Sequence, residues 1–302
     1  MSRNYRFRIV NVFAVPSAAV RDRDNPNAVV SGGGVPSRLS GNPLAVIEDA
    51  TGLNDAEMQQ LALQFNLSES TFVLPSGEAD ARVRIFTPTF EMPFAGHPTL
   101  GTAHVLRTLG RGGDALRLHL NVGVIPVVAE GDVWTLTANV PTHRTYVHTR
   151  AQLAHALGLR EDDIVGAPLW MNAGVEQLIV PLASVEAVVR AKPQMAAFLD
   201  YCSNDREAEA YVYARDGEAG VVSRYFWNQH GAILEDPGTG SACANLGGYL
   251  LATGAAVPLA IEVRQGAATG RPCLLRLTVD ANRRIHVGGR VVELMRGELQ
   301  LD

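Results

Sequence analysis

The sequence lacks the features that several large classes of protein require. It has only three cysteines among 302 residues, and their wide spacing gives no metal-ligand pattern. A low, odd cysteine number is typical of a reducing compartment, so we expect the cytoplasm. No apolar run reaches the roughly 18–20 residues that cross a bilayer. The start of the chain leads straight into a strand pattern without the apolar region of a signal peptide. The sequence thus predicts neither a membrane protein nor a secreted one.

Positive charge is also scarce. Lysine and arginine number 26 against 31 acidic residues, which gives a net charge of −5. This balance offers no electrostatic basis for binding nucleic acid. The short glycine motifs lack the third glycine of a dinucleotide fingerprint and the lysine of a Walker loop. No Gly-x-Ser-x-Gly nucleophile elbow occurs either.

One stretch, residues 235–242, concentrates chemical groups. It reads Glu-Asp-Pro-Gly-Thr-Gly-Ser-Ala and runs into an apolar segment, Cys243–Ala252. Pro237 suits a first helical position, and Asp236 before it suits an N-cap. The free N–H groups of such a helix start bind anions, and a carboxylate lies beside them. The pattern therefore predicts an anion-binding turn at the start of a helix.

A second stretch, residues 95–103, resembles the first after a shift of 139 positions. The shift places Asp236 on His97, Gly240 on Gly101 and Ser241 on Thr102. Each copy follows a strand and precedes an apolar helix. The repeat predicts two similar halves whose helix starts face one cleft, one half offering a histidine and the other an aspartate.

The pattern of elements indicates an α+β protein. Many short strands surround few helices, and the helices expected over Pro98–Leu109 and Cys243–Leu251 are apolar on every side, as buried helices are. We expect two domains, residues 1–130 and 131–290, each a curved mixed sheet around a central helix. A polar, glycine-rich loop is expected over Arg21–Leu39.

Each candidate residue also has a purely structural interpretation. Asp236 can serve as an N-cap only. His97 can be a satisfied core histidine, although histidine is not a favoured cap. Glu69, between two serines, can be a solvated acid at a helix-to-strand turn. Gly96 and Gly240 can serve turn geometry, or their bare N–H groups can bind a carboxylate.

The chain resembles the PhzF-like isomerases of phenazine biosynthesis, which have the diaminopimelate-epimerase-like fold. The resemblance covers nearly the whole chain. Its motifs are Gly-Asn-Pro-Leu-Ala-Val at 41–46, Asn-Leu-Ser-Glu-Ser-Thr-Phe at 66–72, Arg-Ile-Phe-Thr-Pro at 84–88, Pro-Phe-Ala-Gly-His-Pro-Thr-Leu-Gly at 93–101, the stretch 235–242, Gln-Gly at 265–266 and Gly-Arg-Pro at 270–272.

The resemblance implies two pseudo-symmetric domains, with residues 291–302 returning to the first, and a homodimer. It implies isomerisation of trans-2,3-dihydro-3-hydroxyanthranilate, a small carboxylate substrate, without a cofactor or metal. Glu69 would shuttle the proton, and His97 and Asp236 would position the substrate and assist the transfer. The groups expected to bind the substrate are Asn42, the Gly96 amide, Thr239, Gly240 and Ser241.

Departures from the family leave alternatives open. The epimerases of this fold use two cysteines as bases, whereas Cys243 lies deeper in its helix, where we expect a small core residue. The loop over Arg21–Leu39 is longer than is usual in the family, so the substrate stays open. The alternatives are an epimerase or dehydratase that uses the same carboxylate, and a non-catalytic protein that binds a small anion.

Overall fold

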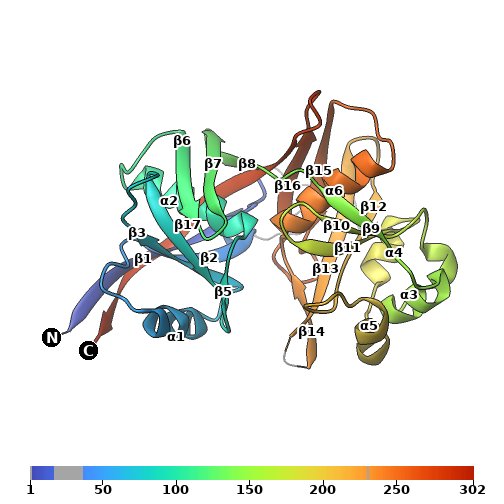
Figure 1. Cartoon of the computed structure of the whole chain (residues 1–302), viewed down its shortest axis with the longest axis horizontal. Coiled ribbons are helices and arrows are strands. Elements are labelled where there is room, and N and C mark those ends of the chain that lie inside the picture. Colours follow the sequence, from blue (N-terminus) through green and yellow to red (C-terminus); the bar gives the residue numbers. More distant parts are fainter. Residues whose placement is uncertain (1, 17–36, 230) are drawn as a thin grey trace. The chain divides into compact units, whose positions relative to one another are not determined.

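The computed structural model describes residues 2–16, 37–229 and 231–302 (Figure 1). The chain forms two compact units. The second holds Ala138–Val287, and the first holds the described residues up to 137 together with Gly288–Asp302. Across the described part of the chain, we find no helix with both the length and the apolar character needed to cross a membrane. The expected loop over Arg21–Leu39 lies outside the described residues, except for a short 3₁₀ turn, Ser37–Leu39.

The first unit is a mixed sheet that closes on itself around a helix. Its strands pair in the order β17-β1-β2-β3-β4-β6-β7-β8, and β8 pairs with β17 to complete the ring. The C-terminal strand therefore pairs with the first strand of the chain. The bounds are β1 (Arg3–Val12), β2 (Asn42–Ile47), β3 (Glu69–Leu74), β4 (Ala81–Phe86), β5 (Glu91–Met92), β6 (Ala115–Leu120), β7 (Gly123–Glu130), β8 (Val133–Thr137) and β17 (Ile285–Leu301).

Helix α2 (Gly96–Thr108) occupies the middle of this ring, and its first eleven residues are all buried. The sheet approaches it closely because small residues face the strands. A Cβ atom at Gly101 would lie 2.6 Å from Cδ2 of Leu44 on β2. The second helix, α1 (Asp55–Phe65), covers a separate apolar cluster and begins with the capping box of Asn54 and Glu57 that its sequence predicts.

The second unit repeats this plan. Its sheet runs β9-β10-β11-β12-β13-β15-β16, and helix α6 (Gly240–Ala252) is buried against β10, β11 and β16. The strand bounds are β9 (Thr142–Thr145), β10 (Leu169–Asn172), β11 (Glu176–Pro181), β12 (Glu209–Arg215), β13 (Gly220–Gln229), β14 (Ala232–Asp236), β15 (Leu259–Gln265) and β16 (Cys273–Val279). Three short helices cover a further apolar cluster: α3 (Arg150–Leu157), α4 (Val185–Arg190) and α5 (Met195–Tyr201). The expected architecture, a curved mixed sheet around a central helix in each half, is confirmed.

A matching ion pair shows how the two units correspond. On β4, Arg84 binds both carboxylate oxygens of Glu91 at 2.8 and 2.6 Å. On β13, Arg224 binds both oxygens of Glu235 at 3.0 and 2.6 Å. Each arginine lies over a phenylalanine two residues further along its strand. The register of the strand pairs also agrees, because Phe86 faces Glu91 as Phe226 faces Glu235.

This correspondence corrects the shift of 139 residues expected from the sequence. Gly96 begins α2 and Gly240 begins α6, so the two helices are related by a shift of 144. His97 therefore matches Ser241, and Asp236 matches Met92 on β5. The expectation that His97 and Asp236 occupy equivalent helix starts is wrong. His97 lies in the first turn of its helix, whereas Asp236 ends the strand before the helix.

Candidate functional site

The first unit brings four of the expected residues together, namely Asn42, Glu69, Gly96 and His97. Glu69 begins β3, which lies beside β2, and His97 lies in the first turn of α2. Oε2 of Glu69 is 3.4 Å from Nε2 of His97, and both side chains are largely buried, with 15% and 5% of their surfaces exposed. Asn42, at the start of β2, is fully buried, and its Nδ2 lies 3.4 Å from Nδ1 of His97. These four residues are called the unit-1 site below.

The imidazole of His97 is neutral at physiological pH. Burial lowers its pKa to about 3, which outweighs the opposing effect of a hydrogen bond to the Pro43 backbone. The two ring nitrogens face different groups. Nδ1 faces the Asn42 amide, and Nε2 faces the Glu69 carboxyl group.

This arrangement suits the transfer of a proton. A neutral ring with a lone pair toward Glu69 can accept a hydrogen bond from the protonated acid, and so it stabilises a glutamic acid that has just taken up a proton. A positively charged histidine would instead hold Glu69 ionised. The pair can thus serve a base that must also return its proton.

The second unit gathers Asp236, Thr239, Gly240 and Ser241, which are called the unit-2 site below. The expectation that Asp236 is the N-cap of the helix is wrong, because Thr239 holds that position. The Asp236 carboxylate instead accepts a hydrogen bond from the Thr239 hydroxyl at 2.6 Å. Pro237 likewise precedes the helix and is not its first residue.

Gln265, at the end of β15, fixes this turn. Its side chain donates to the Asp236 carbonyl oxygen and to the Thr239 hydroxyl, both at 2.9 Å, and it accepts from the Thr239 amide at 3.3 Å. The turn after Gln265 leaves no room for a side chain, since a Cβ at Gly266 would lie 2.4 Å from the Pro237 carbonyl oxygen. Gln265 had no role assigned from the sequence, although it stands in one of the family motifs.

The Ser241 hydroxyl is hydrogen-bonded to a side chain that was not expected from the sequence. Gln177 on β11 donates to the Ser241 hydroxyl at 3.1 Å, and Asn245, one turn further along α6, donates to the Gln177 carbonyl at 2.8 Å. Both partners are buried. No sequence signal distinguishes Gln177, because it follows Glu176 at the polar start of β11.

Both central helices begin without a side-chain cap. Ala95 and Thr239 hold the N-cap positions, and neither side chain bonds to the first turn. The first N–H groups of a helix have no carbonyl partner within the helix. Gly96 and Gly240 stand first in α2 and α6, so each site includes backbone donors that attract negative charge.

The cysteines have no place in either site. All three are free and buried. Burial raises the pKa of the Cys202, Cys243 and Cys273 thiols well above the ordinary value, so they are poor nucleophiles and bases. Cys243 is fully buried in α6, as expected for a small core residue.

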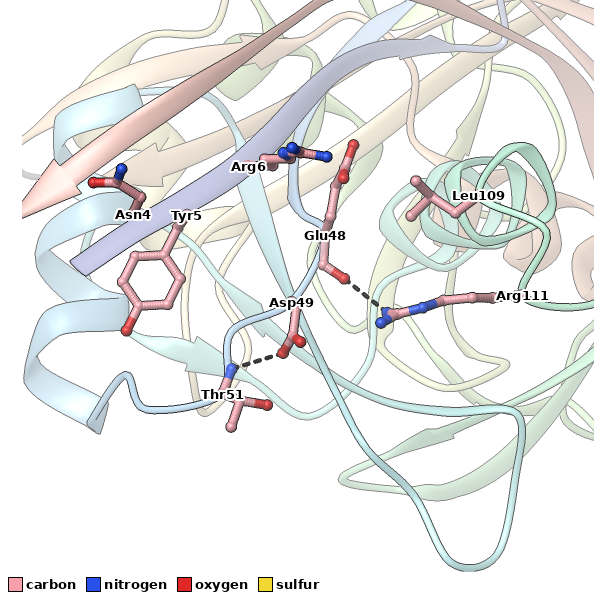
Figure 2. A pocket seen from close by; sticks show the side chains of 8 residues that line it. All are labelled: Asn4, Tyr5, Arg6, Glu48, Asp49, Thr51, Leu109 and Arg111. Carbon is pink, nitrogen blue, oxygen red and sulfur yellow. Dashed lines mark hydrogen bonds between the residues drawn. The ribbon is translucent and has the colours of Figure 1, made fainter.

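A separate polar pocket of about 390 Å³ opens on the first unit and contains none of the expected residues (Figure 2). Charges of both signs line it. Arg111 donates to the Glu48 carbonyl at 2.9 Å, and Asp49 accepts from the Thr51 amide at 3.0 Å. Because its charged groups offset one another, the pocket gives less reason to expect an anionic ligand than the two helix starts do.

Comparison with known proteins gives one consistent result. Residues 36–297 match the family model described as phenazine biosynthesis-like protein, PhzC-PhzF. The chain is similar to an uncharacterized isomerase of Pasteurella multocida, at 38% identity over 86% of this chain and 89% of that protein. It is also similar to the trans-2,3-dihydro-3-hydroxyanthranilate isomerase of Pseudomonas fluorescens, at 36% identity over 87% and 95%. Among solved structures, a predicted epimerase of Pseudomonas aeruginosa matches with a TM-score of 0.74 and 30% identity, covering 98% of this chain and 99% of that one.

Proposed function

Because the chain belongs to the phenazine biosynthesis-like family and is an isomerase, we propose that it shifts a proton on a small carboxylate-bearing substrate, with Glu69 as general acid and base. The observation that carries the proposal is the contact of 3.4 Å between Glu69 and the neutral His97 at the start of α2. A proton shift needs one group that removes a proton from carbon and returns it elsewhere. A largely buried glutamate beside a neutral imidazole suits that task.

In the proposed reaction the Glu69 carboxylate takes a proton from a carbon atom close to an unsaturated acid. The electron pair of the broken C–H bond moves into the conjugated system, and the double bond shifts. The protonated Glu69, hydrogen-bonded to Nε2 of His97, then delivers the proton to a second carbon. The N–H groups at the helix start stabilise the negative charge that develops on the substrate.

The other expected residues receive supporting roles in the proposal. His97 and Asp236 assist the proton transfer, and Asn42, the Gly96 amide, Thr239, Gly240 and Ser241 bind polar groups of the substrate. The uncapped starts of α2 and α6 support the choice of a carboxylate. The Thr239 hydroxyl, already bonded to Asp236, supports a role for that carboxylate in holding a neighbouring ligand group.

Replacement of Glu69 tests the proposal. The substrate named for the Pseudomonas fluorescens relative, trans-2,3-dihydro-3-hydroxyanthranilate, is the first compound to try. In deuterated water the wild type should incorporate deuterium into product, and Glu69→Gln should lower the exchange rate by about 10²–10⁴-fold while it still binds the compound. Glu78→Gln, a change at an exposed glutamate of the same unit, should leave exchange unaltered.

Other outcomes would change the assignment. Unaltered exchange in the Glu69→Gln variant would remove Glu69 from the mechanism. Release of water with a new chromophore would indicate a dehydratase, and inversion of a stereocentre without a shifted double bond would indicate an epimerase. Binding of candidate acids without any exchange would indicate a non-catalytic protein.

A further inference from the structure

A second buried glutamate, Glu209, has no part in the proposed reaction. It begins β12 and is 1% exposed. It accepts a hydrogen bond from the Tyr225 hydroxyl and another, at 2.9 Å, from Nδ2 of Asn204. An ionised carboxylate is costly to bury unless it is paired with a positive charge, and Glu209 has no basic partner at hydrogen-bonding distance among the described residues.

Glu209 stands in the second unit where Glu69 stands in the first. Glu69 comes one residue before Ser70, which pairs with Phe86, and Glu209 comes one residue before Ala210, which pairs with Phe226. In the first unit the glutamate contacts the second residue of the central helix directly. In the second unit the same two positions, Glu209 and Ser241, are linked through other side chains.

The link consists of Tyr225 and Gln177. Burial raises the pKa of Tyr225, and the side chain of Gln177, which lies beside the Tyr225 hydroxyl, opposes that rise as a hydrogen-bond donor does. The Gln177 amide also donates to the Ser241 hydroxyl at 3.1 Å. Asn245 holds the amide in this orientation, because it donates to the Gln177 carbonyl at 2.8 Å and so keeps that oxygen turned away from Ser241. Asn245 is itself held by the Ala173 amide at 2.7 Å and the Val175 carbonyl at 2.9 Å.

The bonds of this chain all point one way. Tyr225 donates to Glu209, so the Tyr225 oxygen is available to accept from Gln177. Gln177 in turn donates to the Ser241 oxygen. A hydroxyl that accepts a hydrogen bond from one side turns its own hydrogen elsewhere, so Ser241 is left as a donor for another oxygen atom.

We propose that Glu209 is a positioning residue that, through Tyr225 and Gln177, sets the Ser241 hydroxyl as a hydrogen-bond donor toward an oxygen of the substrate. The proposal rests on the proposed function, since it deepens the binding role given there to Ser241. Glu209 does not touch the substrate and takes no part in moving the substrate proton. Its contribution is to affinity, and the proton transfer stays with Glu69.

In this proposal, the protonation state of Glu209 controls whether the Ser241 hydroxyl is oriented as a donor. Burial raises the pKa of Glu209 to about 8, against the effect of its hydrogen bonds from Tyr225 and Asn204. The other charged groups that face it are Glu207, which raises the pKa, and Arg206, which lowers it. Below the pKa, the acid carries a proton and loses one of its two acceptor positions. Above it, Glu209 is an acceptor only, and the direction of the chain is fixed.

Kinetics as a function of pH test this control, with trans-2,3-dihydro-3-hydroxyanthranilate as substrate. We expect the KM of the wild type to fall about five- to tenfold as the pH rises through about 8. Glu209→Gln should keep the high KM at every pH and lose this dependence, with an unchanged pH profile of kcat. In a Ser241→Ala background, Glu209→Gln should have no further effect on KM. A KM effect of the same size with and without the Ser241 hydroxyl would overturn the proposal.

Side-chain NMR supplies a readout that needs no substrate. The amide signals of Gln177 should shift with a midpoint near pH 8 in the wild type and stay constant in Glu209→Gln. Tyr225→Phe should also remove the shift. Tyr211→Phe is the control, since Tyr211 is also a buried tyrosine and its hydroxyl bonds to Ser223, which is not part of this hydrogen-bonded series.

Two results separate this proposal from the proposed function. If the amide signals of Gln177 do not shift when Glu209 titrates, the link between Glu209 and Gln177 is disproved, independently of the catalytic activity. Conversely, a Glu69→Gln variant that still exchanges deuterium would disprove the assigned catalytic residue and leave the Gln177 titration unaffected.

Discussion

The two units share one backbone plan but fill it with different chemistry. Both carry the same bidentate arginine–glutamate pair between adjacent strands. Behind it, the first unit places Leu44 of β2 against Gly101 of α2 in an apolar contact. At the matching positions the second unit has Gln177 and Asn245, which form a buried hydrogen bond at 2.8 Å. The shared elements maintain the fold, and the positions that differ surround the two helix starts.

The difference shows how one plan can supply two kinds of site. In the first unit, a histidine in the first helical turn contacts the glutamate of the neighbouring strand directly, at 3.4 Å. In the second unit a serine holds the same helical position, too short to reach the glutamate. Tyr225, Gln177 and Asn245 fill the space between them with oriented hydrogen bonds. The contrast agrees with the proposal, which gives the proton transfer to Glu69 of the first unit and a binding role to Ser241 of the second.

Asn245 and Gly101 occupy matching positions in the two units. Alanine substitutions at these two positions should show the largest difference in stability between the units. Asn245→Ala removes three hydrogen bonds, two of them buried, and leaves the Ala173 amide, the Gln177 carbonyl and the Val175 carbonyl without this partner. It should lower the free energy of unfolding by about 4 kcal/mol. Gly101→Ala should cost only about 2 kcal/mol, through overpacking. Urea unfolding measures both.

A second variant checks the cause of the Gly101 effect. A Cβ at Gly101 would press on Leu44, so shortening Leu44 to valine should relieve part of the strain. The double variant should then lose less stability than the sum of the two single changes. If Asn245→Ala proved milder than Gly101→Ala, the contrast between a polar and an apolar contact would be wrong.

A smaller difference in stability is expected between alanine substitutions at Arg84 and Arg224, which form the same kind of ion pair in the two units. Arg224 also donates to the carbonyl oxygens of Val188, Val189 and Ala191, at 3.3, 3.0 and 2.7 Å. Arg84 instead binds Asp55, whose side chain is 84% exposed. Arg224→Ala should therefore cost about 3 kcal/mol and Arg84→Ala about 2 kcal/mol, because only the first removes a shared donor from three backbone carbonyls.

Lysine at each position provides the control. It keeps the charge but cannot form the two-pronged contact, so both lysine variants should stay below the wild type in urea unfolding. Equal losses for Arg224→Ala and Arg84→Ala would mean that the contacts of Arg224 to the end of α4 contribute nothing measurable.

The central helix of each unit could be predicted from the sequence, but the alignment of the two halves was wrong. Apolar helices with small residues were identified because burial on all sides leaves no polar face. The two stretches were aligned on Pro98 and Pro237, yet Pro98 lies inside its helix and Pro237 lies before its own. The matching proline is Pro93, within a repeat of Glu, Pro and Gly that reads Glu-x-Pro-x-x-Gly in both halves.

The shift changes from 140 to 144 along the chain because the hairpin between β13 and β14 is longer than that between β4 and β5. A single offset could not reveal this. Buried networks were equally hard to see. Gln177 and Glu209 each begin or nearly begin a strand, where polar residues are common, and only tertiary structure shows that they are buried and joined through Tyr225. Within the unit-1 site, the repeat identified His97, whereas the role of Glu69 came from the family motifs, since periodicity alone favoured a solvated acid there.

The stability of the two units should also depend on pH in different ways. In the first unit burial lowers the pKa of His97 to about 3 and that of His104 to about 4. Unfolded histidine has a pKa near 6.5, so the unfolded chain binds these protons first as the pH falls. The stability of the first unit should therefore fall below about pH 6.5, by about 1.4 kcal/mol per pH unit for each histidine.

The second unit should show the opposite sign. The pKa of Glu209 is raised to about 8 from an ordinary 4.5, so the folded form holds a proton that the unfolded chain has lost. Its stability should decline as the pH rises from about 4.5 to 8. Urea unfolding between pH 4 and 8 can follow each unit by its own tryptophans, Trp134 in the first and Trp170 in the second, with the other tryptophans replaced by phenylalanine.

Single substitutions test which residue causes the dependence of the unfolding free energy on pH in each unit. His97→Gln should remove about one proton from the acid slope reported by Trp134, and Glu209→Gln should flatten the slope reported by Trp170. Parallel slopes in the two units would contradict the contrast, because a neutral histidine and a protonated glutamic acid buried at the two sites must respond to pH in opposite directions.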